Sequence, residues 1–264
     1  MNTLLSFQDV EYHYHTISGE TQALKNISFS VREGEFLSIV GPSGCGKTTL
    51  LSMIAGLIKP ESGELHYADT LKNNPSGIGY MLQHDHLFEW RTIYKNVLLG
   101  LELRHKNTKE RRKAALDLLS QYGLYPFRDS YPDELSGGMR QRAALIRTLV
   151  CEPELLLLDE PFSALDYQTR LTVSSDIAQI IKKEKKTAVL VTHDLSEAVA
   201  LSDRILVLSA RPAYVLRIMD IHLTKQGTGA VAARKAPEFS TYFNELWEEL
   251  HGKEQSTLIP PDTI

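Results

Sequence analysis

The sequence predicts an α/β fold built around a mainly parallel β-sheet. Residues 36–40 and 155–159 are short apolar runs with the length and composition of buried strands. A glycine-rich turn follows the first run and leads into a helical segment over residues 48–55, which ends at Gly56 and Pro60. Later in the chain, predicted strands alternate with predicted helices, a pattern typical of parallel sheets.

The flanks of this core predict two additions. Strands are expected over residues 4–10, 27–31 and 64–67, and we assign them to an N-terminal antiparallel β subdomain. After a short strand over 78–82 the pattern becomes helical, which predicts an inserted α-helical subdomain over about residues 87–152. Its expected helices cover residues 93–103, 109–122 and 136–151.

The alternation then returns, with a helix expected over 166–183, strands over 187–192 and 204–208, and a helix over 195–201. We therefore expect one domain over residues 1–223. Residues 224–264 are expected to add a Gly/Ala/Lys-rich loop over 224–236, an amphipathic helix over 239–251 and a tail.

The composition is that of an ordinary soluble globular protein, with 42% hydrophobic and 23% charged residues. A formal net charge of −4 argues against nucleic acid as a partner. No run approaches the ~18 consecutive apolar residues of a membrane span, and the first ten residues lack a basic targeting region, so a membrane role requires a partner. The two cysteines, Cys45 and Cys151, have no metal-site spacing and suit a reducing cytosol.

The glycine-rich turn matches the phosphate-binding pattern G-x-x-x-x-G-K-[ST] at every fixed position. It reads Gly41-Pro42-Ser43-Gly44-Cys45-Gly46-Lys47-Thr48-Thr49. A strand, a glycine-rich turn and a helix N-terminus together form an anion site, because backbone N–H groups and the helix dipole favour negative charge. Lys47 can reach the β- and γ-phosphates, and the Thr48 hydroxyl can hold Mg²⁺. The alternative is a glycine-rich turn that fits the pattern by chance.

Two acids follow the second buried run. Asp159 lies at the C-terminal end of the predicted strand, the edge at which open α/β sheets bind ligands, and is suited to Mg²⁺. Glu160 can orient and deprotonate a water that attacks the γ-phosphate. The alternative is a surface turn that carries two acids.

A second anion site is predicted at Leu135-Ser136-Gly137-Gly138-Met139-Arg140-Gln141-Arg142. Ser136 can cap the helix that follows, and the glycines expose backbone N–H groups. Here the sequence resembles the ATP-binding cassette (ABC) ATPase family, whose signature L-S-G-G-x-x-Q-R it matches, and the resemblance covers roughly residues 4–215. The resemblance implies that Ser136, Gly137 and Gly138 bind the nucleotide held by a second copy, in an ATP-dependent head-to-tail dimer.

The same resemblance implies roles for single residues, with ATP and Mg²⁺ as cofactors. Tyr14 stands where the family has an aromatic that stacks on adenine, although a packing tyrosine is the alternative. Gln83 corresponds to the switch glutamine that touches Mg²⁺ and the attacking water. Asp166 ends the Ser163–Asp166 loop that crosses the dimer interface, and His193 corresponds to the switch histidine that contacts the γ-phosphate.

Two segments resemble a subgroup, the ATPases of nitrate, sulfonate and taurine importers. Residues 84–93 are similar to its L-L-P-W-x-T segment, with Glu89 in place of the usual proline, and residues 208–212 to its L-S-x-R-P stretch. The Pro-Arg pair common in the subgroup is missing near Ile221. The resemblance implies import of a small organic anion or related solute. ATPases for thiamine-precursor or riboflavin-type importers share the pattern, and efflux stays open.

Other ABC classes fit less well or remain as alternatives. Chromosome-structuring members place a long coiled coil between the switch glutamine and the signature, and the interval from Gln83 to Leu135 is too short for one. A soluble single-cassette ATPase in assembly or regulation remains an alternative. The transporter reading implies transmembrane permease subunits as partners, an indirect extracytoplasmic solute-binding protein, and a peripheral position on the cytoplasmic face of the membrane. It also implies that a permease helix docks on residues 84–93.

Overall fold

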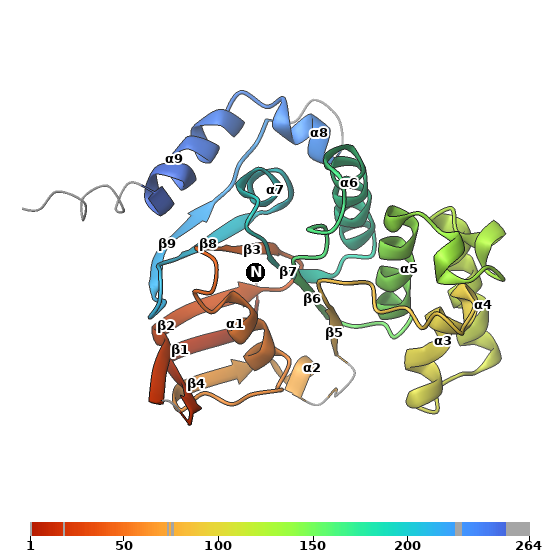
Figure 1. Ribbon diagram of the computed structural model, residues 1–264, viewed down its shortest axis with the longest axis horizontal. Helices are drawn as coiled ribbons and strands as arrows, with labels where there is room; N and C mark the ends of the chain where they lie inside the picture. Colours follow the sequence, from red (N-terminus) through yellow and green to blue (C-terminus); the bar gives the residue numbers. More distant parts are fainter. Residues whose placement is uncertain (1, 18, 73, 75–76, 225–228, 252–264) are drawn as a thin grey trace, which may run out of the picture. The chain divides into compact units, whose positions relative to one another are not determined.

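A computed structural model describes residues 2–17, 19–72, 74, 77–224 and 229–251 of the chain (Figure 1). The chain divides into two compact units. The first comprises residues 1–68 and 190–264, and the second comprises residues 69–189. Within the described residues, no helix is both long and apolar enough to cross a membrane.

The first unit contains a three-stranded antiparallel sheet with the order β2-β1-β4. Its strands are β1 (Thr3–Thr16), β2 (Gly19–Arg32) and β4 (Ser62–Tyr67). Phe7 of β1 stacks on Phe29 of β2, with ring centroids 4.6 Å apart, and both rings are buried. The first two strands are longer than predicted, since they extend into a hairpin whose mixed sequence has no regular hydrophobic alternation.

The phosphate-loop pattern lies between β3 (Phe36–Val40) and α1 (Lys47–Ile54) of the same unit. β3 pairs in parallel with β8 (Arg204–Leu208), and β8 pairs antiparallel with β9 (Val215–Asp220). Every residue of β3 and β8 is buried, as expected from strands that are apolar except for Ser38 and Arg204. The sequence prediction missed β9 because this partly exposed edge strand has no regular alternation.

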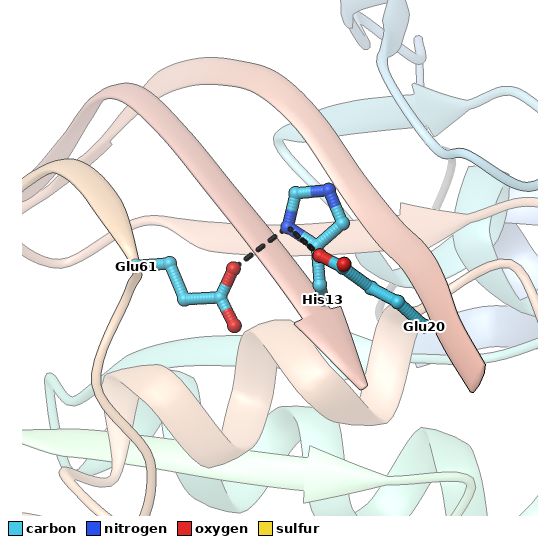
Figure 2. Close-up of side chains that lie close together, drawn as sticks. All are labelled: His13, Glu20 and Glu61. Atoms are coloured by element: carbon cyan, nitrogen blue, oxygen red, sulfur yellow. Dashed lines mark hydrogen bonds and ion pairs between the residues drawn. The ribbon is translucent and has the colours of Figure 1, made fainter. Parts of the chain in front are cut away.

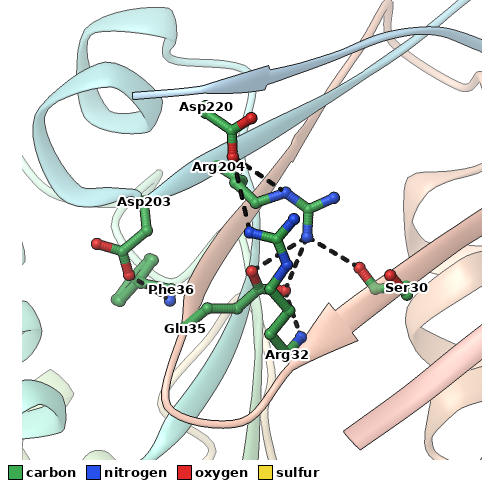
Figure 3. A network of polar contacts seen from close by, with 7 residues as sticks. All are labelled: Ser30, Arg32, Glu35, Phe36, Asp203, Arg204 and Asp220. Atoms are coloured by element: carbon green, nitrogen blue, oxygen red, sulfur yellow. Dashed lines mark hydrogen bonds and ion pairs between the residues drawn. The ribbon is translucent and has the colours of Figure 1, made fainter. Parts of the chain in front are cut away.

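A buried ion pair fixes the start of β3 (Figure 3). Arg204 of β8 donates to Glu35 over 3.1 Å, and both side chains are more than nine-tenths buried. Glu35 also accepts from the backbone N–H of Arg32 over 2.6 Å, which closes the turn before β3. Asp203 accepts from the backbone N–H of Phe36 over 2.8 Å. These bonds position the strand whose opposite end carries the phosphate loop.

Three helices complete the first unit, α7 (Leu195–Leu201), α8 (Gly229–Arg234) and α9 (Phe239–His251). Leu246 of α9 is fully buried in a cluster that includes Val40 and Val207. The prediction of a loop over residues 224–236 was wrong at α8, because Ala230 and Ala233 bury against Ala200 and alanine favours helix. Residues 225–228 and the predicted tail lie outside the described residues.

The second unit contains the strand order β5-β6-β7, with β5 and β6 parallel. The strands are β5 (Ile78–Met81), β6 (Leu155–Asp159) and β7 (Thr187–Val191), which begins in this unit. Its helices and helical turns are α2 (Asp69–Lys72), α3 (Ile93–Leu103), α4 (Lys109–Gln121), η1 (Tyr125–Phe127), η2 (Pro132–Glu134), α5 (Gly137–Leu149) and α6 (Tyr167–Lys183). The predicted fold class, a mainly parallel sheet with an antiparallel β subdomain and an inserted helical region, is confirmed.

Candidate functional site

The phosphate-loop pattern forms a strand–turn–helix in the first unit. Lys47 is the first residue of α1, and its buried side chain folds back into the turn. Its Nζ donates to the backbone oxygens of Gly41, at 2.8 Å, and Pro42, at 2.9 Å. The ammonium group is therefore held inside the turn, next to the backbone N–H groups at the helix start. This arrangement is suited to phosphate.

Glycine is required at two positions of the turn. Gly44 and Gly46 have φ angles of +71° and +123°, which side chains with a Cβ rarely adopt. A Cβ on Gly46 would also lie 2.8 Å from Leu24 Cδ2. Arg211, from the stretch that resembles L-S-x-R-P, donates to the Gly44 oxygen over 2.6 Å. Arg211 therefore stabilises the turn. In the sequence analysis this residue served only to assign the chain to a subgroup.

Of the remaining residues of this motif, some are buried and others are exposed. Burial raises the pKa of the Cys45 thiol, which favours the neutral, unreactive form. Ser43 and Thr48 are exposed. Thr49 is buried, and its Oγ1 lies 2.8 Å from the hydroxyl oxygen of Tyr14.

The Tyr14 contact ties β1 to the first turn of α1. Tyr14 is 40% exposed, and its ring packs edge-on against Tyr12 with centroids 5.1 Å apart. Because its hydroxyl is bound to Thr49, this ring is held beside the phosphate loop while one part stays open to solvent. An open aromatic surface at this place is what stacking on a base needs.

His193 follows β7 between two anchored neighbours. The Thr192 hydroxyl donates to Glu197 over 2.8 Å, and Thr192 N–H donates to the Ile39 oxygen over 3.3 Å. Asp194 caps α7 by accepting from the N–H groups of Ser196 and Glu197. The His193 side chain itself is exposed. The backbone on both sides of this exposed side chain is therefore fixed.

In the second unit, Asp159 is the last residue of β6 and Glu160 follows it, and the two acids lie in different environments. Asp159 is buried, and its Oδ2 accepts from the Tyr80 hydroxyl of β5 over 3.1 Å. Glu160 has a φ of +44°, an uncommon angle for a residue with a Cβ and one that concentrates at functional sites. The sequence analysis missed Tyr80, whose position opposite Leu157 in the β5–β6 pairing brings it to the same sheet edge.

Ser163 joins Gln83 to the backbone of Glu160. The Gln83 side-chain amide donates to Ser163 Oγ over 3.2 Å, and Ser163 Oγ donates to the Glu160 oxygen over 3.0 Å. Gln83, the predicted switch residue, is therefore connected through Ser163 to the backbone of Glu160, the predicted base. Sequence spacing could not reveal it, since Gln83 and Ser163 are 80 positions apart.

The signature residues form a helix N-terminus that packs closely on α6. Ser136 caps α5 by accepting from Met139 N–H over 3.4 Å, as predicted. A Cβ on Gly138 would lie 2.7 Å from Val173 Cγ2, and a Cβ on Gly137 would lie 3.0 Å from Leu165 Cδ2. The two glycines therefore allow a close approach of this helix start to its neighbours.

Asp166 caps α6 and accepts from Thr169 N–H over 3.1 Å. Its hydrogen bonds with Thr169 lower the pKa of the Asp166 carboxyl group. This cap lies at the start of the helix predicted over residues 166–183. Asp166 and Ser136 thus begin two helices of the same unit with the same kind of side-chain bond.

Two arginines of α5 hold the segment that follows Gln83. Arg140, within the signature, donates to the Asp85 carboxylate over 3.1 Å. Arg147, two turns later, donates to the backbone oxygens of Asp85 and His86, both over 2.7 Å. The sequence analysis identified neither contact, because the partners are more than fifty positions apart.

A phosphate loop, a buried strand that ends in two acids and a glycine-rich second helix start define the class as a nucleotide-binding ATPase. Residues 24–163 match the model of the ABC transporter family, more than half of the chain. The chain belongs to this family and is an ATP-binding cassette ATPase.

Known proteins are similar along most of the chain. An uncharacterized ABC transporter ATP-binding protein, YtlC of Bacillus subtilis (strain 168), is 47% identical over 254 residues, which are 96% of this chain and 98% of that protein. The nitrate import ATP-binding protein NrtD of Synechocystis sp. is 41% identical, covering 89% and 91%. The aliphatic sulfonates import ATP-binding protein SsuB of Bacillus anthracis is 38% identical, covering 83% and 87%. The predicted resemblance to this subgroup is confirmed.

One solved structure shows the same fold in a nucleotide-bound state. It is the dimeric post-hydrolysis state of the ATP-binding cassette MJ0796 with ADP and Pi, at a TM-score of 0.70 and 32% identity. The match covers 83% of this chain and 99% of that one.

Proposed function

We propose that this chain is the ATP-hydrolysing subunit of an importer, in which two copies drive a transmembrane permease. The observation that carries the proposal is the similarity to import ATP-binding proteins along more than four-fifths of both chains. The chain supplies the chemistry, and the permease supplies the path, because the described residues contain no helix suited to span a membrane. The proposed location is therefore the cytoplasmic face of the membrane, held there by the partner.

Each predicted site residue has a proposed role in hydrolysis. Lys47 binds the β- and γ-phosphates with charge-assisted hydrogen bonds from inside the turn. Glu160 takes a proton from the attacking water. Gln83 contacts the attacking water, and His193 contacts the γ-phosphate. Ser163 bonds both the Gln83 side chain and the Glu160 backbone oxygen, so a displacement of Gln83 is transmitted to Glu160. Tyr14 stacks on adenine.

The proposed ligands of Mg²⁺ are Thr48, Gln83 and Asp159. Hydroxyl, amide and carboxylate oxygens are donors that Mg²⁺ accepts, so the residue types fit the ion. Tyr80 orients the buried Asp159 carboxylate by donating to one of its oxygens. When bound, the ion would neutralise charge on the phosphates. The protein residues hold and orient this group.

The second copy completes the site. Ser136, Gly137, Gly138 and Asp166 face the nucleotide held by the other copy, in a head-to-tail dimer. ATP then favours the closed pair because it contacts both copies, and loss of the γ-phosphate contacts reopens the pair. The dimeric state of MJ0796 with ADP and Pi supports this proposal.

A permease-docking surface is proposed at residues 84–93. Phe88 and Trp90 stack with ring centroids 4.7 Å apart, although they are 37% and 74% exposed. Beneath them the buried Asn96 side chain accepts from Phe88 N–H and donates to the oxygens of Phe88, Arg91 and Thr92. An exposed aromatic pair on a backbone held this firmly is suited to bind an apolar partner face.

The docking surface is also acidic on one side. Glu89 lines a surface pocket of about 490 Å³ together with Pro126, Asp129, Ser130, Tyr131, Asp133 and Glu134. Four carboxylates line this pocket. One of them, Asp129, is paired with Arg128 over 3.3 Å, and the remaining negative charge favours a cation. The permease helix that docks here is therefore expected to present one apolar face and at least one Lys or Arg.

The proposed transported solute is a small organic anion or related compound, of the nitrate, sulfonate or taurine type. A thiamine- or riboflavin-type precursor is the alternative, and a solute-binding protein outside the membrane delivers either one. The solute does not contact this chain in the proposed mechanism, so its identity depends on the permease. A soluble single-cassette ATPase is the competing function.

Co-purification with transport assays separates these functions. The wild-type chain is expressed with its neighbouring permease genes, and the membrane fraction is solubilised and captured through the chain. We expect a permease to co-purify, and Phe88→Asp to lose it and to lose solute uptake while the isolated chain retains its ATPase rate. Leu103→Asp is the control, a charge at another exposed apolar residue of the same unit. Absence of any membrane protein from the wild-type complex would favour the soluble alternative.

A further inference from the structure

Three side chains gather near the turn of the β1–β2 hairpin (Figure 2). His13 Nδ1 lies 2.7 Å from Glu61 Oε2 and 3.8 Å from Glu20 Oε1. A fourth side chain, His15, places its Nε2 2.9 Å from the second oxygen of Glu61. The ligand atoms of His13, Glu20 and Glu61 all lie within 4.8 Å of one another.

Backbone pairing brings these residues together. His13 and His15 are two positions apart on β1, so their side chains leave the same face of the strand. Glu20 is directly opposite His15 in the β1–β2 register. Glu61 immediately precedes β4, and its N–H donates to the Glu11 oxygen over 3.1 Å. The cluster therefore comes from three adjacent strand segments with fixed spacing.

The donor set is that of a transition-metal site. Imidazole nitrogens and carboxylate oxygens are ligands of Zn²⁺ at about 2.0–2.2 Å, so two tetrahedral ligands lie about 3.4 Å apart. The two His13 separations, 2.7 and 3.8 Å, fall on both sides of that value, and no separation in the group exceeds 4.8 Å, so shifts of about 1.5 Å or less suffice.

We propose that His13, Glu20 and Glu61, with His15 as a fourth ligand or as the group that orients Glu61, bind one divalent transition-metal ion such as Zn²⁺. The site is separate from the proposed Mg²⁺ ligands. A metal ion would join β1, β2 and the start of β4, and so hold the strand that carries Tyr14. Metal occupancy would thereby stabilise the hairpin on which the adenine contact depends.

Metal titration of the full-length chain tests the proposal. The tag-free, nucleotide-free protein is titrated with Zn²⁺ against a chelating dye, and with Co²⁺ for its visible spectrum. We expect one equivalent to bind, with His13→Ala and Glu61→Gln each weakening binding by about tenfold or more. The Co²⁺ spectrum should show nitrogen and oxygen ligation without a thiolate band, which excludes Cys45 and Cys151 as ligands.

A matched control is present on the same sheet. His66 Nε2 lies 2.9 Å from Glu64 on β4, an exposed pair with one imidazole and one carboxylate. His66→Ala should leave the Zn²⁺ affinity unchanged. Zn²⁺ should also raise the Tm of the wild type and of His66→Ala, but not of Glu61→Gln, whose metal-free Tm reports whether the variant folds. Equal affinity in wild type and His13→Ala, or no stoichiometric binding in the wild type, would overturn the proposal and leave an ordinary ion-pair cluster.

Discussion

Replacing Gly138 by alanine isolates the reason for glycine in the signature. The added methyl group would meet Val173 Cγ2 at 2.7 Å and Thr169 Cγ2 at 3.2 Å. Both neighbours are β-branched residues of α6, whose side chains have little rotamer freedom in a helix. The methyl group therefore has to push the start of α5 away from α6.

Two opposing contributions set the expected size of the effect. Overpacking costs about 1–3 kcal/mol, and the gain in helix propensity from Gly to Ala offsets about 1 kcal/mol of it. A net loss near 1 kcal/mol lowers the Tm by about 2–4 °C in a chain of this size. ATPase activity should fall more than stability suggests, because the displaced helix start carries Ser136 and Gly137.

A double-mutant cycle measures the clash itself. Gly138→Ala, Val173→Ala and the double variant are compared by thermal unfolding and by ATPase rate. Val173→Ala alone should destabilise by leaving a cavity, whereas in the double variant the new methyl group and the shortened side chain should compensate by about 0.5–3 kcal/mol. The reasoning is refuted if Gly138→Ala is as stable as the wild type and the two changes are additive.

Three further predictions address the nucleotide site. Lys47→Ala should lose most ATPase activity and nucleotide affinity, measured with a fluorescent ATP analogue, because charge-assisted bonds are worth about 1.5–3 kcal/mol each; normal turnover would show that the loop is not catalytic. Glu160→Gln should slow hydrolysis by about 10²–10⁴-fold and accumulate as an ATP-bound dimer with doubled mass by light scattering. A wild-type rate would place the base elsewhere. Tyr14→Phe should keep nucleotide affinity within about threefold, since the ring remains and one neutral hydrogen bond is worth only about 0.5–1.5 kcal/mol. Tyr14→Ala removes the ring and should weaken nucleotide affinity more. Equal losses of affinity in the two variants would argue against stacking.

Much of the fold could be predicted because its signals are local. The strand over 155–159 and the helices over 93–103 and 195–201 match the predicted bounds, since each has either an uninterrupted apolar run or a clear boundary. The edge strand β9 and the short helix α8 lack such signals. Their formation depends on pairing with β8 and on packing against Ala200, which are contacts across the chain.

The candidate site also has features that the sequence could predict and features that it could not. The phosphate loop, the paired acids and the helix caps are motifs of adjacent residues, so the sequence alone could identify them. Tyr80, Ser163 as a bridge, and Arg211 as a brace act on partners that are about 80 to 170 positions away. Only the pairing of β5 with β6 and the return of the chain to the first unit create these contacts, which no spacing rule encodes.

The ion pair between Arg140 and Asp85 has a consequence for two copies working together. Arg140 belongs to the signature, which in the proposed dimer faces the nucleotide of the other copy. Asp85 lies two residues after Gln83, which is proposed to contact the nucleotide of its own copy. One side-chain contact thus lies between responses to two different ATP molecules. We expect the two sites to bind and hydrolyse ATP cooperatively. Disrupting the Arg140–Asp85 contact should therefore lower the Hill coefficient for ATP toward one.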